Sequence, residues 1–183
     1  RALSSYKLIE DHFLSGILGR PVYFFKSPVE TLSNSKFPQP PCFIYNKTKT
    51  CEIEDIKKVE NLGFHLIDTN LIFCLKKKNF VEQLSLPPRY SMRWSCSTDC
   101  DVVGNIARNN FQYSRFHLDP LIENSVADDV KKAWATNFFS GTRGDHMIVS
   151  CYDEQPIGFT QILHQSKNEL VIDLIAVDLE HRG

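Results

Sequence analysis

The sequence predicts an α/β protein, and two observations lead to this fold class. In residues 90–177 the spacing of apolar residues predicts, in order, a strand, two helices and three strands. In residues 9–75, helical spacing alternates with short runs rich in β-branched and aromatic residues. Helices and strands that alternate along a chain are typical of domains in which helices cover a sheet.

A proline pair divides the chain into two predicted domains. Pro87 and Pro88 follow a basic run at residues 76–78, and each proline fixes φ and lacks a backbone donor. The hydrophobic pattern stops there and resumes beyond the pair. We therefore expect a small α/β domain over residues 1–85 and a second domain over residues 88–183.

In the first domain, the spacing of apolar residues predicts helices and the glycines predict their ends. Ile9, Phe13 and Ile17 lie on one side of a helix that Gly19 ends, and Gly63 stops a later helix. The expected elements are a helix over residues 9–18, strands over 21–25 and 42–45, a helix over 53–62, and a strand or hairpin over 64–75.

In the second domain, Ser125 and Asp128 have the spacing of a capping box, which predicts the start of a helix. Its apolar stripe includes Val130 and Trp134, and Gly141 lies just past its end. The other expected elements are a strand over residues 90–96, a helix over 99–109, and strands over 146–152, 156–164 and 170–177.

Charge and cysteine content disfavour several function classes. Lys and Arg total 21 and Asp and Glu total 22, so a net charge of −1 draws the protein neither to nucleic acid nor to an anionic membrane. Because the apolar runs are too short to span a bilayer and no secretory signal is evident, we expect a soluble, cytoplasmic protein. The six cysteines lack the spacing of a zinc site, so we expect reduced, mostly buried thiols and no metal.

The last apolar strand carries the first functional signal. Residues 170–177 contain little polarity and lead into Arg182 and Gly183. Backbone N–H groups after such a strand can bind phosphates. A core strand followed by a surface turn also explains these residues.

A resemblance to a known family adds to this signal. The segment Ile172–Gly183, preceded by Gln155-Pro-Ile-Gly-Phe159, resembles the central strand pair and the opening of the pyrophosphate loop of the GCN5-related N-acetyltransferase superfamily. The resemblance implies the acyl-CoA N-acyltransferase fold, with a mixed, mostly antiparallel sheet and acetyl-CoA as co-substrate. It also implies that the second domain is truncated at the pyrophosphate loop, so that the C-terminal part of the fold is missing.

Four further segments narrow the resemblance. Leu62–Ile67, Asn110–Phe116, Lys132–Asn137 and Ser140–Asp145 are similar in order and spacing to the dTDP-fucosamine N-acetyltransferase family. That family acetylates the 4-amino group of dTDP-4-amino-4,6-dideoxygalactose. The resemblance therefore implies direct attack of the amine of a nucleotide-linked deoxyamino sugar on acetyl-CoA.

The resemblance also implies roles for residues near the end of the chain. The cofactor-binding residues are expected to be Leu174, Ile175, Ala176 and Val177 through the main chain, with Arg182 and Gly183 opening the diphosphate loop. An ordinary ladder strand is the alternative for the strand residues. Asp173 is the candidate base, directly or through water, and its alternative is a carboxylate facing solvent from a strand edge. The general acid, usually a Tyr in this superfamily, would lie beyond Gly183.

A polar loop between two helices is the predicted acceptor site, because loops often carry binding groups. Arg115 could hold a phosphate, and His117 or Asp119 a sugar hydroxyl. Alternatively, Arg115 pairs with Asp119 to brace the loop, much as Arg143 and Asp145 are expected to brace a hairpin. The predicted substrate-binding residues are Tyr113, Arg115, His117 and Asp119.

Two alternatives to sugar acetylation stay open. The first keeps the acetyltransferase fold and changes the acceptor to an amino acid, a polyamine or a protein amine. The second is a non-catalytic module that binds acyl-CoA or a protein partner. A homodimer also stays open.

Overall fold

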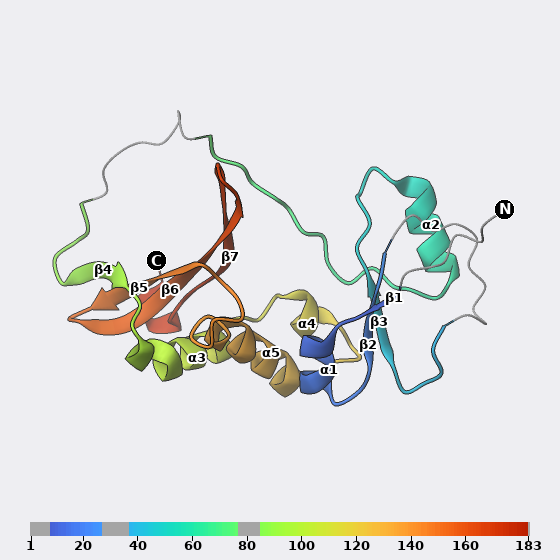
Figure 1. The fold of residues 1–183 in the computed structure, drawn as a ribbon, viewed down its shortest axis with the longest axis horizontal. Coiled ribbons are helices and arrows are strands. Elements are labelled where there is room, and N and C mark those ends of the chain that lie inside the picture. The colour runs from blue at the N-terminus through green and yellow to red at the C-terminus, as the bar shows by residue number, and fades with distance from the viewer. Residues whose placement is uncertain (1–7, 27–36, 77–84, 183) are drawn as a thin grey trace. The chain divides into compact units, whose positions relative to one another are not determined.

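The computed structural model describes residues 8–26, 37–76 and 85–182 (Figure 1). The chain forms two compact units, Arg1–Thr69 and Asn70–Gly183. One unit holds a three-stranded sheet and the other a four-stranded sheet, and both contain helices. The α/β class predicted from the sequence is therefore confirmed.

The first unit has a mixed sheet with the strand order β1-β2-β3. Its elements are β1 (Leu8–Glu10), α1 (His12–Leu18), β2 (Val22–Phe25), β3 (Phe43–Asn46) and α2 (Ile53–Asn61). β1 pairs antiparallel with β2, and β2 pairs parallel with β3. Phe25 and Val59 form the buried centre of its core, and Phe64 packs against them.

Helix α1 begins later than predicted. Asp11 caps it, because the Asp11 carboxylate accepts a hydrogen bond from the Leu14 amide at 2.9 Å. The residues before Asp11 form β1, so the predicted helical start at residue 9 is wrong. The predicted end is confirmed, since Gly19 has φ of 64°, a left-handed conformation that glycine adopts easily.

The strand or hairpin predicted over residues 64–75 is wrong, because this described stretch has no regular secondary structure. Its large apolar side chains are mostly exposed, at 78% for Leu66 and 89% for Phe73. β-branched and aromatic residues favour a strand only where a neighbouring strand and a packed face are present. No such partner strand lies beside this segment within the described residues.

The second unit follows the predicted order of strand, helix, helix and three strands, with three additional short helices. Its elements are β4 (Tyr90–Trp94), η3 (Ser97–Asp99), α3 (Cys100–Asn109), α4 (Arg115–Leu118), α5 (Asn124–Thr136), β5 (His146–Tyr152), β6 (Gln155–Ser166), β7 (Glu169–Val177) and η4 (Leu179–His181). The sheet order is β4-β5-β6-β7. Every neighbouring pair in this described sheet is antiparallel.

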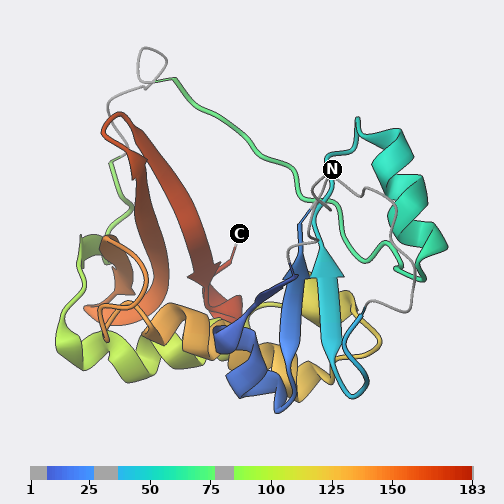
Figure 2. The ribbon, with the colours of Figure 1, turned by 45° about the vertical axis from the view of Figure 1, so that its right-hand side comes forward.

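Helices α3 and α5 lie side by side and cover one face of this sheet (Figure 2). Side chains alternate between the two faces of a strand, so every second residue of β5 points to the helices. The buried core consists of Val103, Ile106, Ala107, Ala135, Met147, Val149, Cys151, Phe159, Leu174 and Ala176. The other face of the sheet carries exposed apolar side chains, among them Trp94 and Ile175.

An ion pair between the exposed Arg93 and the buried Asp99 ties β4 to the start of α3. The Arg93 guanidinium donates to both carboxylate oxygens of Asp99, at 2.7 and 2.8 Å. Asp99 also accepts a hydrogen bond from the Cys96 amide at 2.8 Å. These hydrogen bonds, above all those from Arg93, lower the pKa of Asp99 to about 2.

This ion pair predicts a pH dependence of stability. The unfolded chain takes up a proton at Asp99 near the ordinary carboxyl pKa of about 4, whereas the folded chain does so near about 2. The contribution is therefore fully present above about pH 4 and is lost as the pH falls toward about 2. We expect the difference in unfolding free energy between wild type and Asp99→Asn, measured in urea, to shrink over this range. A difference that does not change with pH would contradict this account.

The cysteines differ from expectation. Cys151 is buried, but Cys51, Cys74 and Cys96 are exposed, so the prediction of mostly buried thiols is wrong. Cys74 lies in the extended segment that has no packed face, which explains its exposure.

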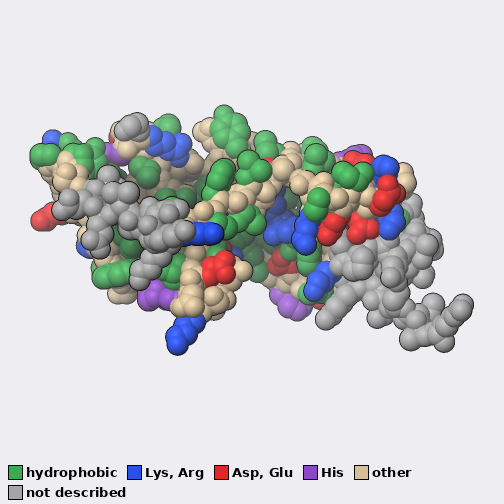
Figure 3. Space-filling view, turned by 90° about the horizontal axis from the view of Figure 1, so that it is seen from above, with side chains coloured by type: hydrophobic (Ala, Val, Ile, Leu, Met, Phe, Trp, Pro, Cys, Tyr) green, Lys and Arg blue, Asp and Glu red, His purple; other side chains and the backbone are tan. Residues whose placement is uncertain are grey.

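The described surface carries mixed charges. On the face that Figure 3 shows, Lys and Arg side chains lie scattered among acidic and apolar ones. Among the described residues, no helix has both the length and the apolar content needed to cross a membrane.

Candidate functional site

The edge strand β7 of the second unit contains a β-bulge at the residue predicted as the base. Leu174 pairs with Gln161 on β6, whereas Ile172 pairs with Ile162, the next residue along β6. Asp173 is therefore an extra residue in β7, as in a β-bulge. The bulge turns Asp173 and Leu174 toward the same face of the sheet, the one covered by the helices.

The Asp173 carboxylate lies at the centre of a polar cluster. Arg143 donates to both of its oxygens, at 2.6 Å from Nε and 2.6 Å from Nη2. Trp134 Nε1 donates to Oδ2 at 2.9 Å, and Gln161 Nε2 donates to the same oxygen at 3.2 Å. The Arg143 guanidinium also stacks over the Trp134 ring, 4.4 Å from its centroid. One carboxylate thus joins β6, β7, α5 and the segment before β5.

This geometry bears on the two interpretations of Asp173. The Asp173 side chain is only 9% exposed, so the alternative of a carboxylate facing solvent is wrong. A general base needs a lone pair directed at the substrate proton, but here four donors converge on the two oxygens. The arrangement favours a positioning role that fixes the bulge.

Arg143 and Asp145 have different structural roles. Arg143 reaches across to Asp173 on β7, so its predicted role as a brace of its own hairpin is wrong. Asp145 does brace the β5–β6 hairpin, because its carboxylate accepts a hydrogen bond from the His164 amide at 2.7 Å.

The backbone of β7 presents amides at the open edge of the described sheet. The Asp178 amide donates to the Ile157 carbonyl at 2.7 Å, which makes this a hydrogen-bonded pair. Such pairs alternate with non-hydrogen-bonded pairs along an antiparallel ladder. When this alternation is followed back from Asp178 along the pairing of β7 with β6, Ile175 and Val177 belong to non-hydrogen-bonded pairs. Their N–H groups therefore face away from β6.

The other two predicted strand residues face inward. Leu174 and Ala176 have amides directed to β6 by the same register, and their side chains lie in the buried core. Only two of the four predicted amides therefore face the open edge. The sequence could not tell the outward-facing amides from the inward-facing ones. A shift of one residue in the pairing of β6 with β7 would reverse which amides face the open edge.

Arg182 fixes the turn after β7. Its Nη2 donates to the Asn110 carbonyl at 2.8 Å and to Asn110 Oδ1 at 3.1 Å, and its Nε donates to the Val177 carbonyl at 3.0 Å. The guanidinium thus ties the end of β7 to the end of α3. Gly183, the other predicted loop residue, lies outside the described residues.

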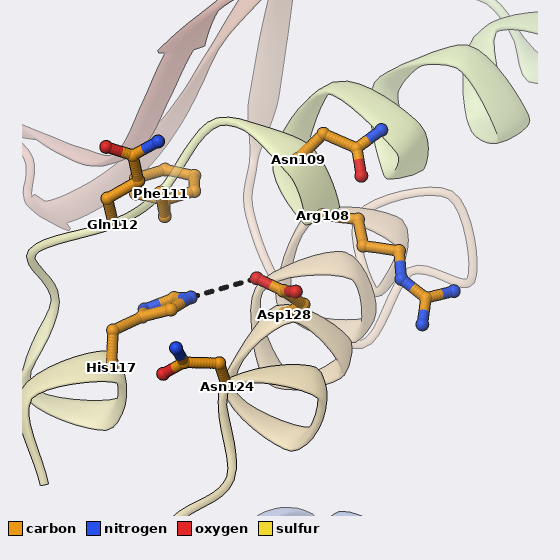
Figure 4. Close-up of a pocket in the computed structure, with 7 residues that line it drawn as sticks. All are labelled: Arg108, Asn109, Phe111, Gln112, His117, Asn124 and Asp128. Carbon is orange, nitrogen blue, oxygen red and sulfur yellow. Dashed lines mark hydrogen bonds and ion pairs between the residues drawn. The ribbon is translucent and has the colours of Figure 1, made fainter.

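A polar pocket of about 310 Å³ lies beside α3, α4 and α5, all in the second unit (Figure 4). Its lining combines one aromatic ring with amide, imidazole, carboxylate and guanidinium groups. The lining residues are Arg108, Asn109, Phe111, Gln112, His117, Asn124 and Asp128.

His117 is held in this pocket from two sides. Its side chain is 5% exposed, with Nε2 at 3.0 Å from Asp128 Oδ1 and Nδ1 at 2.7 Å from Ser114 Oγ. A carboxylate can only accept, so the proton lies on Nε2, and in the neutral ring Nδ1 accepts from the Ser114 hydroxyl. The imidazole thereby fixes the orientation of the Asp128 carboxylate, as the dashed line in Figure 4 shows.

The other residues of the predicted acceptor loop lie outside the pocket lining. Tyr113 is 81% exposed. The Arg115 guanidinium stacks over the Phe116 ring, 4.4 Å from its centroid. Asp119 accepts a hydrogen bond from the Leu121 amide at 2.9 Å and so stabilises the following turn.

Asp128 was misassigned in the sequence interpretation. Helix α5 begins at Asn124 with Glu123 as its N-cap, two residues before Ser125, the N-cap of the predicted capping box. Asp128 therefore lies inside the helix, where its carboxylate is directed to His117. His117 and Asp128 are eleven residues apart, and their pairing depends on how α4 and α5 meet, so no signal for it exists in the sequence.

The pocket and the bulge are linked through packed side chains. The Lys131 ammonium lies 4.5 Å from the centroid of the Phe111 ring and 5.3 Å from that of Trp134. Trp134 in turn donates to Asp173. A cation held between two aromatic rings is a stabilising arrangement, so the pocket wall and the β7 bulge form one connected cluster.

Comparison with known proteins adds one relative. No family model matches this chain. The chain is 29% identical over 91 residues to the spore coat polysaccharide biosynthesis protein SpsD of Bacillus subtilis (strain 168). The match covers 50% of this chain and 31% of that relative, so the chain spans about a third of the relative's length.

Proposed function

We propose that this chain is part of an acetyl-CoA-dependent N-acetyltransferase that acetylates the amine of a nucleotide-linked deoxyamino sugar. The observation that carries the proposal is the open edge of β7, where the amides of Ile175 and Val177 face outward beside a bulge that Asp173 fixes. An acyl-CoA arm binds there as an additional strand, with its thioester carbonyl accepting from one of these amides.

The reaction in this proposal is direct attack of a neutral amine on the thioester carbonyl. The protein positions the two substrates and stabilises the oxyanion that forms as the C–N bond is made and the C–S bond breaks. Main-chain amides suit this task because they are held by the sheet and do not reorganise. Arg182, tied to Asn110, holds the turn that leads to the diphosphate of the coenzyme.

The acceptor in this proposal binds in the polar pocket. A volume of about 310 Å³ is at the lower end of the usual range for small-molecule sites and suits one sugar ring. The amides of Asn109, Gln112 and Asn124 can each donate to and accept from hydroxyl groups. The Phe111 ring offers an apolar surface, and the Asp128 carboxylate can accept from a hydroxyl or an amine. This set of groups supports a polyhydroxylated acceptor better than a simple aliphatic amine.

The relative supports the same substrate class, since its name places that protein in polysaccharide biosynthesis. Arg108 at the pocket rim would meet the phosphates of the nucleotide carrier. It pairs with Asp129 at 3.1 Å, so a phosphate would share or replace that partner.

A turnover assay with paired acceptors tests this proposal. We expect acetyl-CoA-dependent release of the coenzyme thiol with dTDP-4-amino-4,6-dideoxygalactose, and none with the same nucleotide sugar carrying a hydroxyl in place of the amine. Activity on spermidine or free amino acids alone would overturn the sugar assignment. Binding of acetyl-CoA without turnover on any amine would indicate a non-catalytic module.

His117 provides a prediction specific to the acceptor pocket. His117→Ala leaves Asp128 without its buried partner, and a lost hydrogen bond to a charged group corresponds to about a tenfold rise in acceptor KM. We expect the KM for acetyl-CoA to stay near the wild-type value. The control is Tyr113→Phe, at an exposed position outside the pocket lining. An effect on acetyl-CoA KM with unchanged acceptor KM would contradict this assignment of the pocket.

A further inference from the structure

A pair of histidines on the open face of the second sheet lies outside both parts of the proposed site. His146 begins β5 and His164 lies near the end of β6. Their Nε2 atoms are 3.1 Å apart, and their ring centroids are 5.1 Å apart. Both residues are exposed, and the Trp94 ring lies beside His146 with its centroid at 5.7 Å.

The sheet register brings these two rings together. His146 pairs with Ile162, and His164 lies two residues further along β6 on the same face. The neighbouring Met147 is buried toward the helices, so His146 points to the opposite, uncovered face. Asp145 holds the backbone at His164 through a hydrogen bond of 2.7 Å, which fixes the end of β6 next to β5.

The separation of the two nitrogens suits a shared metal ion. A transition metal binds imidazole nitrogen at about 2.0–2.1 Å, so two nitrogens 3.1 Å apart subtend an angle of roughly 95–100° at the metal. This angle lies between the right angle of square-planar or octahedral sites and the tetrahedral angle. In the metal-free pair, one Nε2–H donates to the other ring, so at least one lone pair already points at the space between them.

We propose that His146 and His164 form a two-histidine site for a divalent transition metal such as Zn²⁺, Ni²⁺ or Cu²⁺. Imidazole nitrogen is the ligand that these ions share. Within the described residues, no group of three or more His, Cys, Asp or Glu side chains could hold a metal ion, so water completes the coordination sphere. The site is thus open and exchangeable. This proposed site differs from the sequence-based expectation of no metal. The two histidines are eighteen residues apart in the sequence, and only the pairing of β5 with β6 brings them together.

Calorimetric titration of the whole chain with Zn²⁺ alone tests this site. We expect one Zn²⁺ to bind, with the affinity reduced by about tenfold or more in His146→Asn and in His164→Asn, since even altering groups around metal ligands has effects of this size. His65→Asn, at an exposed histidine of the first unit, is the matched control and should leave the affinity unchanged. Both test residues are exposed, so the variants should keep the wild-type circular dichroism spectrum.

Two further outcomes make the test decisive. Lack of Zn²⁺ binding by the wild-type chain would overturn the proposal. Binding that survives in a variant with both His146→Asn and His164→Asn would also overturn it, because that signal would belong to the exposed thiols of Cys51, Cys74 or Cys96.

Discussion

Replacing Asp173 by leucine is expected to destabilise the second unit by about 2–4 kcal/mol, because it leaves Arg143, whose side chain is 37% exposed, without the 9% exposed carboxylate that it pairs with. The substitution also removes the acceptor of Trp134 and Gln161. We expect acetyl transfer to be lost as well, since the bulge that directs the β7 amides is no longer fixed. Urea unfolding monitored by tryptophan fluorescence measures the first effect and thiol release the second.

A second variant distinguishes the cost of leaving a charge unpaired from the cost of changing the side-chain shape. Arg143→Met combined with Asp173→Leu removes both charges and should be less destabilised than Asp173→Leu alone, because no unpaired charge is left. Asp145→Asn, which alters an exposed carboxylate nearby, should change stability by less than about 1 kcal/mol. If Asp173→Leu were as stable as wild type, the proposed anchoring of the bulge would be wrong.

Replacing Val177 by proline is expected to lower the rate of acetyl transfer by about 100- to 1000-fold, the range found when one oxyanion donor is removed. Proline deletes the N–H that faces the open edge of β7 and leaves the bonds to β6 intact, because proline is tolerated on edge strands. The reaction rate with saturating acetyl-CoA, compared by single turnover, is the measurement.

Val177→Ala is the matched control for this prediction. Alanine shortens the same side chain but keeps the amide, so this variant should stay within about tenfold of the wild-type rate. Equal losses in the proline and alanine variants would show that the side chain matters and the amide does not. That result would remove the main support for the coenzyme site.

Much of the second unit could be predicted from the sequence because its hydrophobic pattern is regular. The strand periodicity of residues 146–177 and the apolar stripe on the helix that contains Trp134 both follow the observed elements. Errors arose where a capping side chain or a missing neighbour decided the outcome. Asp11 shortened α1, and the segment with Phe73 has no described partner strand.

The candidate site was less predictable, for a physical reason. The role of Asp173 depends on a one-residue bulge, and the pairing of His117 with Asp128 depends on how two helices meet. Neither a bulge nor a helix contact leaves a periodic signal in one sequence. Of the four residues predicted in the acceptor loop, only His117 lines the pocket.

The central claim, that the open edge of β7 receives the acyl-CoA arm, is tested most directly by following backbone amide signals in a nuclear magnetic resonance titration with acetyl-CoA. The amides of Ile175 and Val177 should show the largest shifts, and those of Leu174 and Ala176, which face β6, much smaller ones. Shifts confined to other parts of the chain, or none at saturating ligand, would contradict the coenzyme site and the acetyltransferase proposal built on it.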